Sequence, residues 1–167
     1  MTLDSRMNDA LDNQEFKLYY QPKVDVTSGK IVGFEALMRW HSATNDETVF
    51  PDEFIGAAER SGFILKLGDW LINNVLEQLA EWRKRGIEIP VAVNISAVQV
   101  HQNRIYETLK RGLAKYGVSG KLLELELTES VIMENSDNVI TNLEAIRAEG
   151  IEISIDDFGR GYSNLAY

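Results

Sequence analysis

The chain has 167 residues, with 26 acidic and 17 basic side chains, a formal net charge of -9 and no cysteine. This length suits one globular domain, and the absence of cysteine excludes a disulfide framework and a thiolate zinc site. The acidic balance argues against wrapping duplex DNA, which requires many Lys and Arg contacts to phosphate. No apolar run is long enough to span a bilayer, and the N-terminus lacks the apolar core of a signal peptide. We therefore expect a cytoplasmic domain without membrane contact of its own, although the full-length protein could be membrane-tethered.

The first half of the chain predicts helices and β-prone segments in alternation. Residues 1–13 place Met7, Ala10 and Leu11 on one side of a helix, which we interpret as an approach helix or linker from an upstream domain. A strand at residues 18–21 is expected to stop at Pro22. The elements that follow are a strand at 31–40, a loop containing Asn45 and Asp46, a helix from Pro51 to about Gly62, and the longest helix at about 68–85.

The second half of the chain predicts a regular strand–helix alternation. It comprises strands at 91–96, 122–128 and 151–156, helices at about 103–116 and 137–149, and a glycine-bearing loop at 158–163. This order is typical of a parallel sheet with helical crossovers.

Four predicted strands carry an apolar face and a polar face, whereas parallel strands covered on both sides read as continuous apolar runs. Two interpretations are open: a two-layer sheet with a solvated polar face, or a closed barrel with polar groups pointing inward. Glu35, Asn94, Glu126 and Asp156 each stand towards the end of a strand. If these ends converge at one rim, their oxygens would hold hard cations such as Mg²⁺ or Mn²⁺. The alternation alone favours neither interpretation.

Four ordered blocks of sequence resemble a known family. The blocks are Tyr20-Gln21-Pro22 with Phe34-Glu35-Ala36-Leu37-Met38-Arg39-Trp40, then Val93-Asn94-Ile95-Ser96, then Glu126-Leu127-Thr128-Glu129-Ser130, then Asp156-Asp157-Phe158-Gly159-Arg160-Gly161-Tyr162-Ser163. Together they resemble the EAL domain, the family of cyclic di-GMP phosphodiesterases. The resemblance covers residues 14–167 and favours the barrel interpretation. It implies an α/β fold of the modified (β/α)₈ TIM type with one antiparallel strand.

The resemblance also implies a reaction and roles for particular residues. The reaction opens one phosphodiester of cyclic di-GMP to give linear pGpG, with two divalent ions, Mg²⁺ or Mn²⁺. Five residues match the metal ligands of the family: Glu35, Asn94, Glu126, Asp156 and Asp157. Glu129 matches the glutamate that steadies the loop from Phe158 to Ser163. Three residues match substrate contacts: Gln21, Leu37 and Arg39, with Arg39 towards a phosphate.

Two departures from the family pattern qualify these expectations. Arg160 and Asn164 replace the usual Thr and Ser of the glycine-bearing loop. The chain also stops at Tyr167, whereas a full barrel takes about 250 residues. We therefore expect the N-terminal two-thirds of the domain, without positions for the catalytic lysine of the next strand or for a downstream glutamate. The alternative function is a catalytically silent cyclic di-GMP sensor or protein-interaction module, but the presence of Glu35, Asp156 and Asp157 favours the enzyme.

Partners and the remaining conspicuous residues complete the expectations. The resemblance implies a homodimer, association through open barrel edges, and an upstream sensory or GGDEF domain. His41 and His101 have no partner at metal-like spacing, so both are interpreted as surface or loop residues. Trp70 and Trp82 are assigned to the core stripe of the longest helix.

Overall fold

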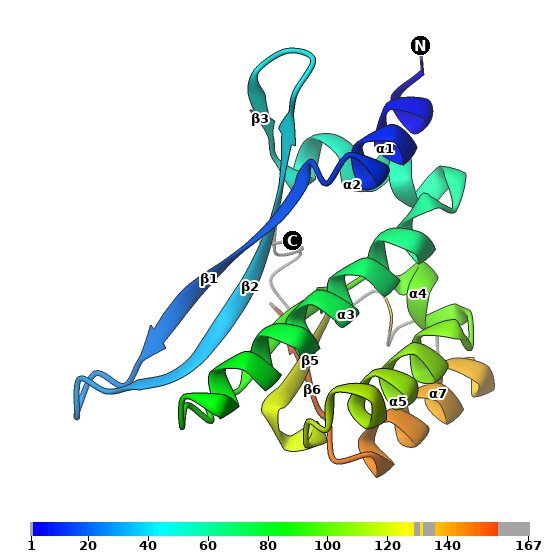
Figure 1. The fold of residues 1–167 in the computed structure, drawn as a ribbon. Helices are drawn as coiled ribbons and strands as arrows, with labels where there is room; N and C mark the ends of the chain where they lie inside the picture. Colours follow the sequence, from blue (N-terminus) through cyan, green and yellow to red (C-terminus); the bar gives the residue numbers. More distant parts are fainter. Residues whose placement is uncertain (1, 129–130, 132–135, 157–167) are drawn as a thin grey trace.

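A single sheet organises the molecule. The computed structural model describes residues 2–128, 131 and 136–156. Six strands are present there: β1 Phe16–Val24, β2 Ile31–Ser42, β3 Glu47–Val49, β4 Val91–Ile95, β5 Leu123–Thr128 and β6 Glu152–Asp156. Their order is β1-β2-β4-β5-β6, with β3 paired to β2 (Figure 1). β1 and β3 run antiparallel to β2, whereas β2, β4, β5 and β6 are parallel to one another.

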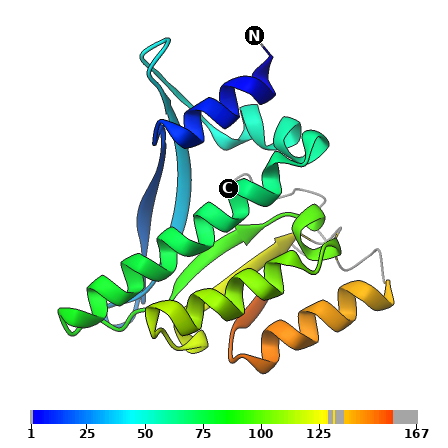
Figure 2. The ribbon, with the colours of Figure 1, turned by 45° about the vertical axis from the view of Figure 1, so that its right-hand side comes forward.

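Helices cover the apolar face of this sheet. They are α1 Leu3–Asp12, α2 Pro51–Ser61, α3 Phe63–Lys84, α4 Ala97–His101, α5 Arg104–Tyr116 and α7 Asp137–Ala148, with a 3₁₀ turn at Gly120–Leu122. Figure 2 shows α3, α5 and α7 lying along the same side of the parallel strands. Within the described ranges, no helix has the length and apolar character needed to cross a membrane.

The predicted alternation is confirmed on β2 and β5, where it separates a packed face from a polar one, whereas all of β4 is buried and Ile155 of β6 is exposed. On β5, Leu123, Leu125 and Leu127 are buried, while the side chains between them are half-buried. The buried leucines belong to one core with apolar side chains of α3, α5 and α7. The predicted α/β class is confirmed. The strands of the main sheet follow chain order, helices lie on one face, and one long antiparallel strand stands at the start. The part of the chain that the structure describes forms an open sheet with the strand order of a barrel wall.

A second core joins the N-terminal helix to the end of the β1–β2 hairpin. Met7 and Ala10 of α1 are fully buried, together with Phe16 of β1, Trp40 of β2 and Phe54 of α2. The ring centroids of Phe16 and Trp40 lie 5.6 Å apart, and those of Phe16 and Phe54 lie 5.7 Å apart. The helix predicted at 1–13 is therefore present, and it packs against the body of the domain. The expected domain boundary at residue 14 stays a prediction.

The structure corrects several element boundaries. β1 continues through Pro22 to Val24, because β1 pairs only with β2 in the described sheet and an edge strand tolerates a residue without an N–H. The neighbouring N–H of Phe34 is satisfied by the carbonyl of Pro90, at 2.9 Å. α3 begins at Phe63 rather than near residue 68, because Gly62, with φ 82°, separates it from α2 in a single residue. β3 and α4 were not predicted; both are very short.

One close approach fixes the base of β5 and β6. Gly120 begins the 3₁₀ turn that leads into β5, and a Cβ built there would lie 2.2 Å from the carbonyl oxygen of Glu149. Glu149 and Gly150 end α7 and lead into β6. The two backbones therefore touch at a point where any side chain would force the strands apart.

We expect Gly120→Ala to lower the free energy of unfolding by about 1–3 kcal/mol, because the methyl group would collide with backbone that cannot rotate away. Gly56 of α2 is the matched control: it is exposed, and a Cβ there would meet only the end of the Arg60 side chain. Gly56→Ala should instead stabilise the helix by about 0.5–1 kcal/mol. Urea unfolding of the two variants measures both effects. Equal stability of Gly120→Ala and the unsubstituted chain would contradict the close approach.

Candidate active site

Three of the expected metal ligands lie in a row across the polar face. Glu35 of β2 has Ala92 of β4 as its register partner, and Asn94, two residues further on, faces Glu126 of β5. Side chains two residues apart on a strand share a face, so all three belong to the face opposite the helices. The amide Nδ2 of Asn94 donates to Oε1 of Glu35 at 3.3 Å. The structure therefore brings these three residues together, as the sequence analysis expected of the strand ends.

Each residue of the row is partly shielded from water. Asn94 is only 8% exposed, and Glu35 and Glu126 are half-buried. Glu35 lies near the middle of β2 rather than at its end, because β2 extends to Ser42, where it pairs with β3. Glu35 therefore lies nearer the amino-terminal end of β2 than the sequence analysis expected. Asn94 and Glu126 lie in the carboxyl-terminal halves of β4 and β5.

A lysine that the sequence analysis did not select completes the row. The ammonium Nζ of Lys23, on β1, lies 3.3 Å from Oε1 of Glu126, and the two residues are 103 positions apart in the sequence. Three interstrand spacings, about 14 Å in a sheet, separate β1 from β5. Since side chains project roughly perpendicular to a sheet, this contact requires the polar face to be concave.

The electrostatics of the row centre on Glu126. Burial raises the pKa of this carboxyl above its usual value, and the negative charge of Glu35 raises it further. The positive charge and the hydrogen bond of Lys23 act in the opposite direction, and Glu124 adds a smaller raising effect. The net pKa shift is upward, chiefly because of burial. Apart from this shift, the carboxylates of Glu35 and Glu126 carry more negative charge than Lys23 alone offsets. Such a site favours binding of an additional cation.

The fourth strand brings Asp156 to the same face by its register. Ser154 of β6 is the partner of Glu126, and Asp156 lies two residues later, opposite Thr128. The backbone thus places Asp156 at the end of β6, in step with the row, while its side chain is outside what the structure describes. Glu129, Asp157 and the loop at 158–163 also lie outside the described residues.

The three expected substrate-contacting residues flank the row on the β1–β2 hairpin. Gln21 is the register partner of Glu35 and is exposed. Leu37 and Arg39 follow Glu35 at period two on the same face, and both are half-buried. Arg39 donates from Nη1 to the carbonyl of Met38 at 2.7 Å, and its guanidinium carbon lies 4.9 Å from the centre of the Phe50 ring. The guanidinium is therefore held beside the row by a short hydrogen bond and an aromatic contact.

The donor set fits a hard divalent cation. Glu35, Asn94 and Glu126 present carboxylate and amide oxygens, which are the ligands that Mg²⁺ and Mn²⁺ prefer. Lys23 already places one positive charge against Oε1 of Glu126. Among the described residues no group of three His, Cys, Asp or Glu side chains is close enough to hold a metal. The described set has two carboxylates and an amide.

A second polar group at the same face was also missed from the sequence. His41 was interpreted as a surface or loop residue. It lies in β2 and uses both ring nitrogens: Nε2 meets the hydroxyl of Tyr19 at 2.8 Å, and Nδ1 meets that of Thr48 at 2.9 Å. Tyr19 faces Leu37 across β1 and β2 and is 52% exposed. The sequence analysis ended this strand at residue 40, so it placed His41 outside the strand and missed both contacts.

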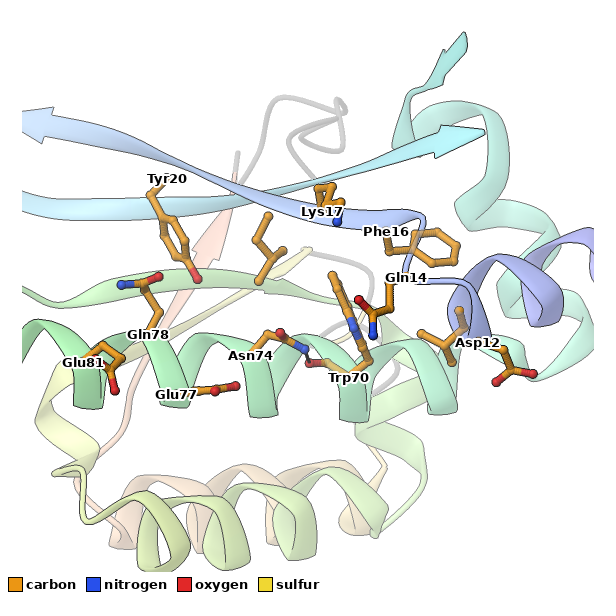
Figure 3. Close-up of a pocket in the computed structure, with 12 residues that line it drawn as sticks. Asp12, Gln14, Phe16, Lys17, Tyr20, Trp70, Asn74, Glu77, Gln78 and Glu81 are labelled. Carbon is orange, nitrogen blue, oxygen red and sulfur yellow. Dashed lines mark hydrogen bonds between the residues drawn. The ribbon is translucent and has the colours of Figure 1, made fainter. Parts of the chain in front are cut away.

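A large groove among the described residues lies elsewhere. It has a volume of about 910 Å³ and is bounded by β1, α3 and the end of α1 (Figure 3). Its lining includes Tyr20, Trp70, Asn74 and Glu77, and none of the expected site residues. Burial raises the pKa of the Tyr20 phenol well above its usual value. The groove is on the helix side of the β1–β2 hairpin, away from the row of Glu35, Asn94 and Glu126, which we call the carboxylate row.

A wall of parallel strands with oxygen donors at successive strands of its concave face defines a barrel-type α/β protein with a polar site on that face. The sequence model of the EAL domain matches residues 4–167, and the chain belongs to this family. It is 36% identical over 167 residues to the oxygen sensor protein DosP of Escherichia coli, and 38% identical over 164 residues to the cyclic di-GMP phosphodiesterase PdeR of the same organism.

These matches cover 99% and 98% of the chain, which spans 21% and 24% of the two relatives. Among solved structures, the PaMucR phosphodiesterase in complex with c-di-GMP superposes with a TM-score of 0.89 at 34% identity. The match covers 98% of this chain and 66% of that one. The expected fold and the expected family are both confirmed.

We expect Glu126→Gln to stabilise the metal-free protein at neutral pH, raising its Tm by about 2–4 °C. The raised pKa means that folding favours the protonated carboxyl, so this stability is present below the ordinary Glu value of 4.5 and is lost as pH rises through the folded pKa. The gap between variant and unsubstituted chain should therefore close as the pH falls towards 4.5. Thermal unfolding in EDTA across this range measures it, with Glu124→Gln as the control for loss of one charge on the same face. A gap independent of pH would contradict the assignment.

Proposed function

We propose that the chain is the metal- and substrate-binding part of a cyclic di-GMP phosphodiesterase that opens one phosphodiester bond and releases linear pGpG. The observation that carries the proposal is the row of Glu35, Asn94 and Glu126 on the concave face. Membership of the EAL family supports it, as do a relative named as a cyclic di-GMP phosphodiesterase and a similar structure described as a c-di-GMP complex.

The residues of the row would hold the divalent ions, two of Mg²⁺ or Mn²⁺. Bound there, such ions supply an activated water and neutralise the charge that develops on the phosphate. Glu35 and Glu126 provide the carboxylates for binding, and the hydrogen bond from Asn94 orients Glu35. The shielding of these groups strengthens their attraction for a cation relative to water. Asp156 and Asp157 are proposed as further ligands, and Glu129 as the residue that steadies the loop at 158–163.

The substrate would lie along the β1–β2 hairpin. Gln21 is exposed beside Glu35 and offers an amide for hydrogen bonding, while Leu37 offers an apolar surface for a nucleobase. Arg39 is proposed to face a phosphate, which a guanidinium binds through two parallel hydrogen bonds. The dianionic substrate would thus meet the protein through Arg39 and through cations held at the carboxylates, which offsets the net charge of -9.

The whole protein would work in bacterial second-messenger signalling in the cytoplasm. A relative named as an oxygen sensor, of which this chain matches about a fifth, supports an additional sensory or GGDEF domain upstream. A homodimer, or association through strand edges, is proposed as well, since β1 and β6 each have one neighbour in the described sheet. Light scattering at increasing concentration tests this: a constant monomer mass would count against it.

Hydrolysis of cyclic di-GMP in the presence of Mg²⁺ or Mn²⁺ is the decisive measurement. We expect turnover to pGpG that falls by more than about 100-fold in Glu35→Gln, because the variant loses a ligand of the ions. Glu152→Gln, an exposed carboxylate at the start of β6, should leave the rate unchanged. The same assay on a chain extended to the length of the PaMucR domain tests whether further residues are required.

Absence of turnover in the extended chain, with cyclic di-GMP still bound, would overturn the enzyme and favour the silent sensor. Loss of both binding and turnover would overturn the assignment of cyclic di-GMP itself.

A further inference from the structure

Lys23 is the described cation that contacts the carboxylate row, and no role for it follows from the reaction proposed above. We propose that Lys23 is a resident counter-cation: it holds Glu126 when the divalent ion is absent, and it is displaced from Glu126 when the ion binds. The inference rests on the proposed metal site. The affinity for the divalent ion then depends on its competition with Lys23 for Glu126.

The geometry places the ammonium where a metal ion would compete for the same oxygen. Nζ of Lys23 lies 3.3 Å from Oε1 of Glu126, whose side chain is only 13% exposed. Glu126 faces Asn94 across the β4–β5 ladder, and Asn94 is bonded to Glu35. The ammonium is thus bonded to one donor of the row, and the register of β4 and β5 and the Asn94–Glu35 hydrogen bond link that donor to the other two. A divalent ion that binds the same oxygens would lie within a few ångströms of the lysine, and the two positive charges would repel each other.

The energetics favour a cation on Glu126 at all times. A shielded carboxylate without a partner is unfavourable, and the charges of Glu35 and Glu124 make it more so. Lys23 offsets this cost in the metal-free state. A divalent ion offsets it more completely, because it brings twice the charge to the same donors. Binding of the ion therefore replaces one interaction with another, and the ion-pair free energy is subtracted from its affinity.

The ammonium of Lys23 can move away from Glu126 without a change in the backbone. Its stem crosses β2 at Gly33, its register partner, where the Lys23 Cδ lies 3.7 Å from the position that a Cβ of Gly33 would occupy. The side chain is 39% exposed, so the ammonium can turn into water by rotation of its own torsions. β1 is held by its ladder to β2 and by the packing of Phe16, neither of which involves the ammonium.

Direct titration with Mn²⁺ tests the exchange in the full chain, by calorimetry or by the electron spin resonance of the free ion. Lys23→Met removes the charge and keeps an apolar stem, and it should bind Mn²⁺ about 1.5- to 5-fold more tightly, the range expected for a partly exposed ion pair. Lys23→Arg should restore the affinity of the unsubstituted chain. Lys30→Met, on the same hairpin, is the control, because the described contact of Lys30 with Ser28 uses its backbone N–H. Its affinity should not change.

Thermal unfolding supplies a second readout that a merely structural lysine would not give. In EDTA, Lys23→Met should unfold at a lower temperature than the unsubstituted chain, and with saturating Mn²⁺ the difference should disappear. Lys23→Gln provides a second uncharged variant if Lys23→Met does not fold.

Equal or weaker Mn²⁺ binding by the uncharged variants would overturn the exchange and leave the metal site standing. A stability deficit that persists unchanged in saturating Mn²⁺ would also overturn it. Absence of Mn²⁺ binding in every variant would overturn the proposed metal site, and the exchange with it.

Discussion

The packing of one apolar sheet face against α3, α5 and α7 is the constraint from which the remaining features follow. Because side chains alternate along a strand, burying Leu123, Leu125 and Leu127 under the helices commits Glu124 and Glu126 to the opposite face. The same holds on β4, where Val91, Val93 and Ile95 pack and Asn94 does not. The carboxylate row is thus a product of the same alternation that builds the core.

The β1–β2 hairpin converts this arrangement into a concave site. Its outer face contributes to both cores, through Ala36 to the core under α3 and through Trp40 to the core around α1 and α2. Its other face carries Gln21 and Lys23 of β1. It also carries Glu35, Leu37 and Arg39 of β2. The two cores fix the hairpin at two places along its length and hold it over the polar face of the parallel strands. Lys23 of β1 can therefore contact Glu126 of β5.

The sequence predicted the parallel part of the fold and the shared face of Glu35, Asn94 and Glu126 because both depend on local periodicity. Strands at 91–96 and 122–128 and helices ending at Gly117 and Gly150 are found close to their predicted limits. The Lys23–Glu126 contact could not be predicted, because it joins residues 103 positions apart and depends on the curvature of the sheet. It was further concealed by Pro22, whose usual effect on a strand is suspended at an edge.

His41 shows a different limit of sequence reasoning. A lone histidine next to a polar segment has no periodic signal of its own, and its two hydrogen bonds depend on β3, a strand of three residues. Roles that depend on Glu129 and Asp157 lie beyond the described residues and stay predictions. Patterns of spacing thus predict which face a residue occupies, whereas contacts between distant strands depend on three-dimensional shape.

The close approach of Gly120 to the end of α7 divides the molecule by its tolerance of sequence change. At that end of β5 and β6 the backbones touch, so position 120 accepts no added volume. On the concave face, Gln21 is exposed and Glu35 and Arg39 are half-buried, away from the helices. Substitutions there change the polar surface at little cost in folding. Related proteins can therefore differ in the polar residues of this face while keeping the same fold.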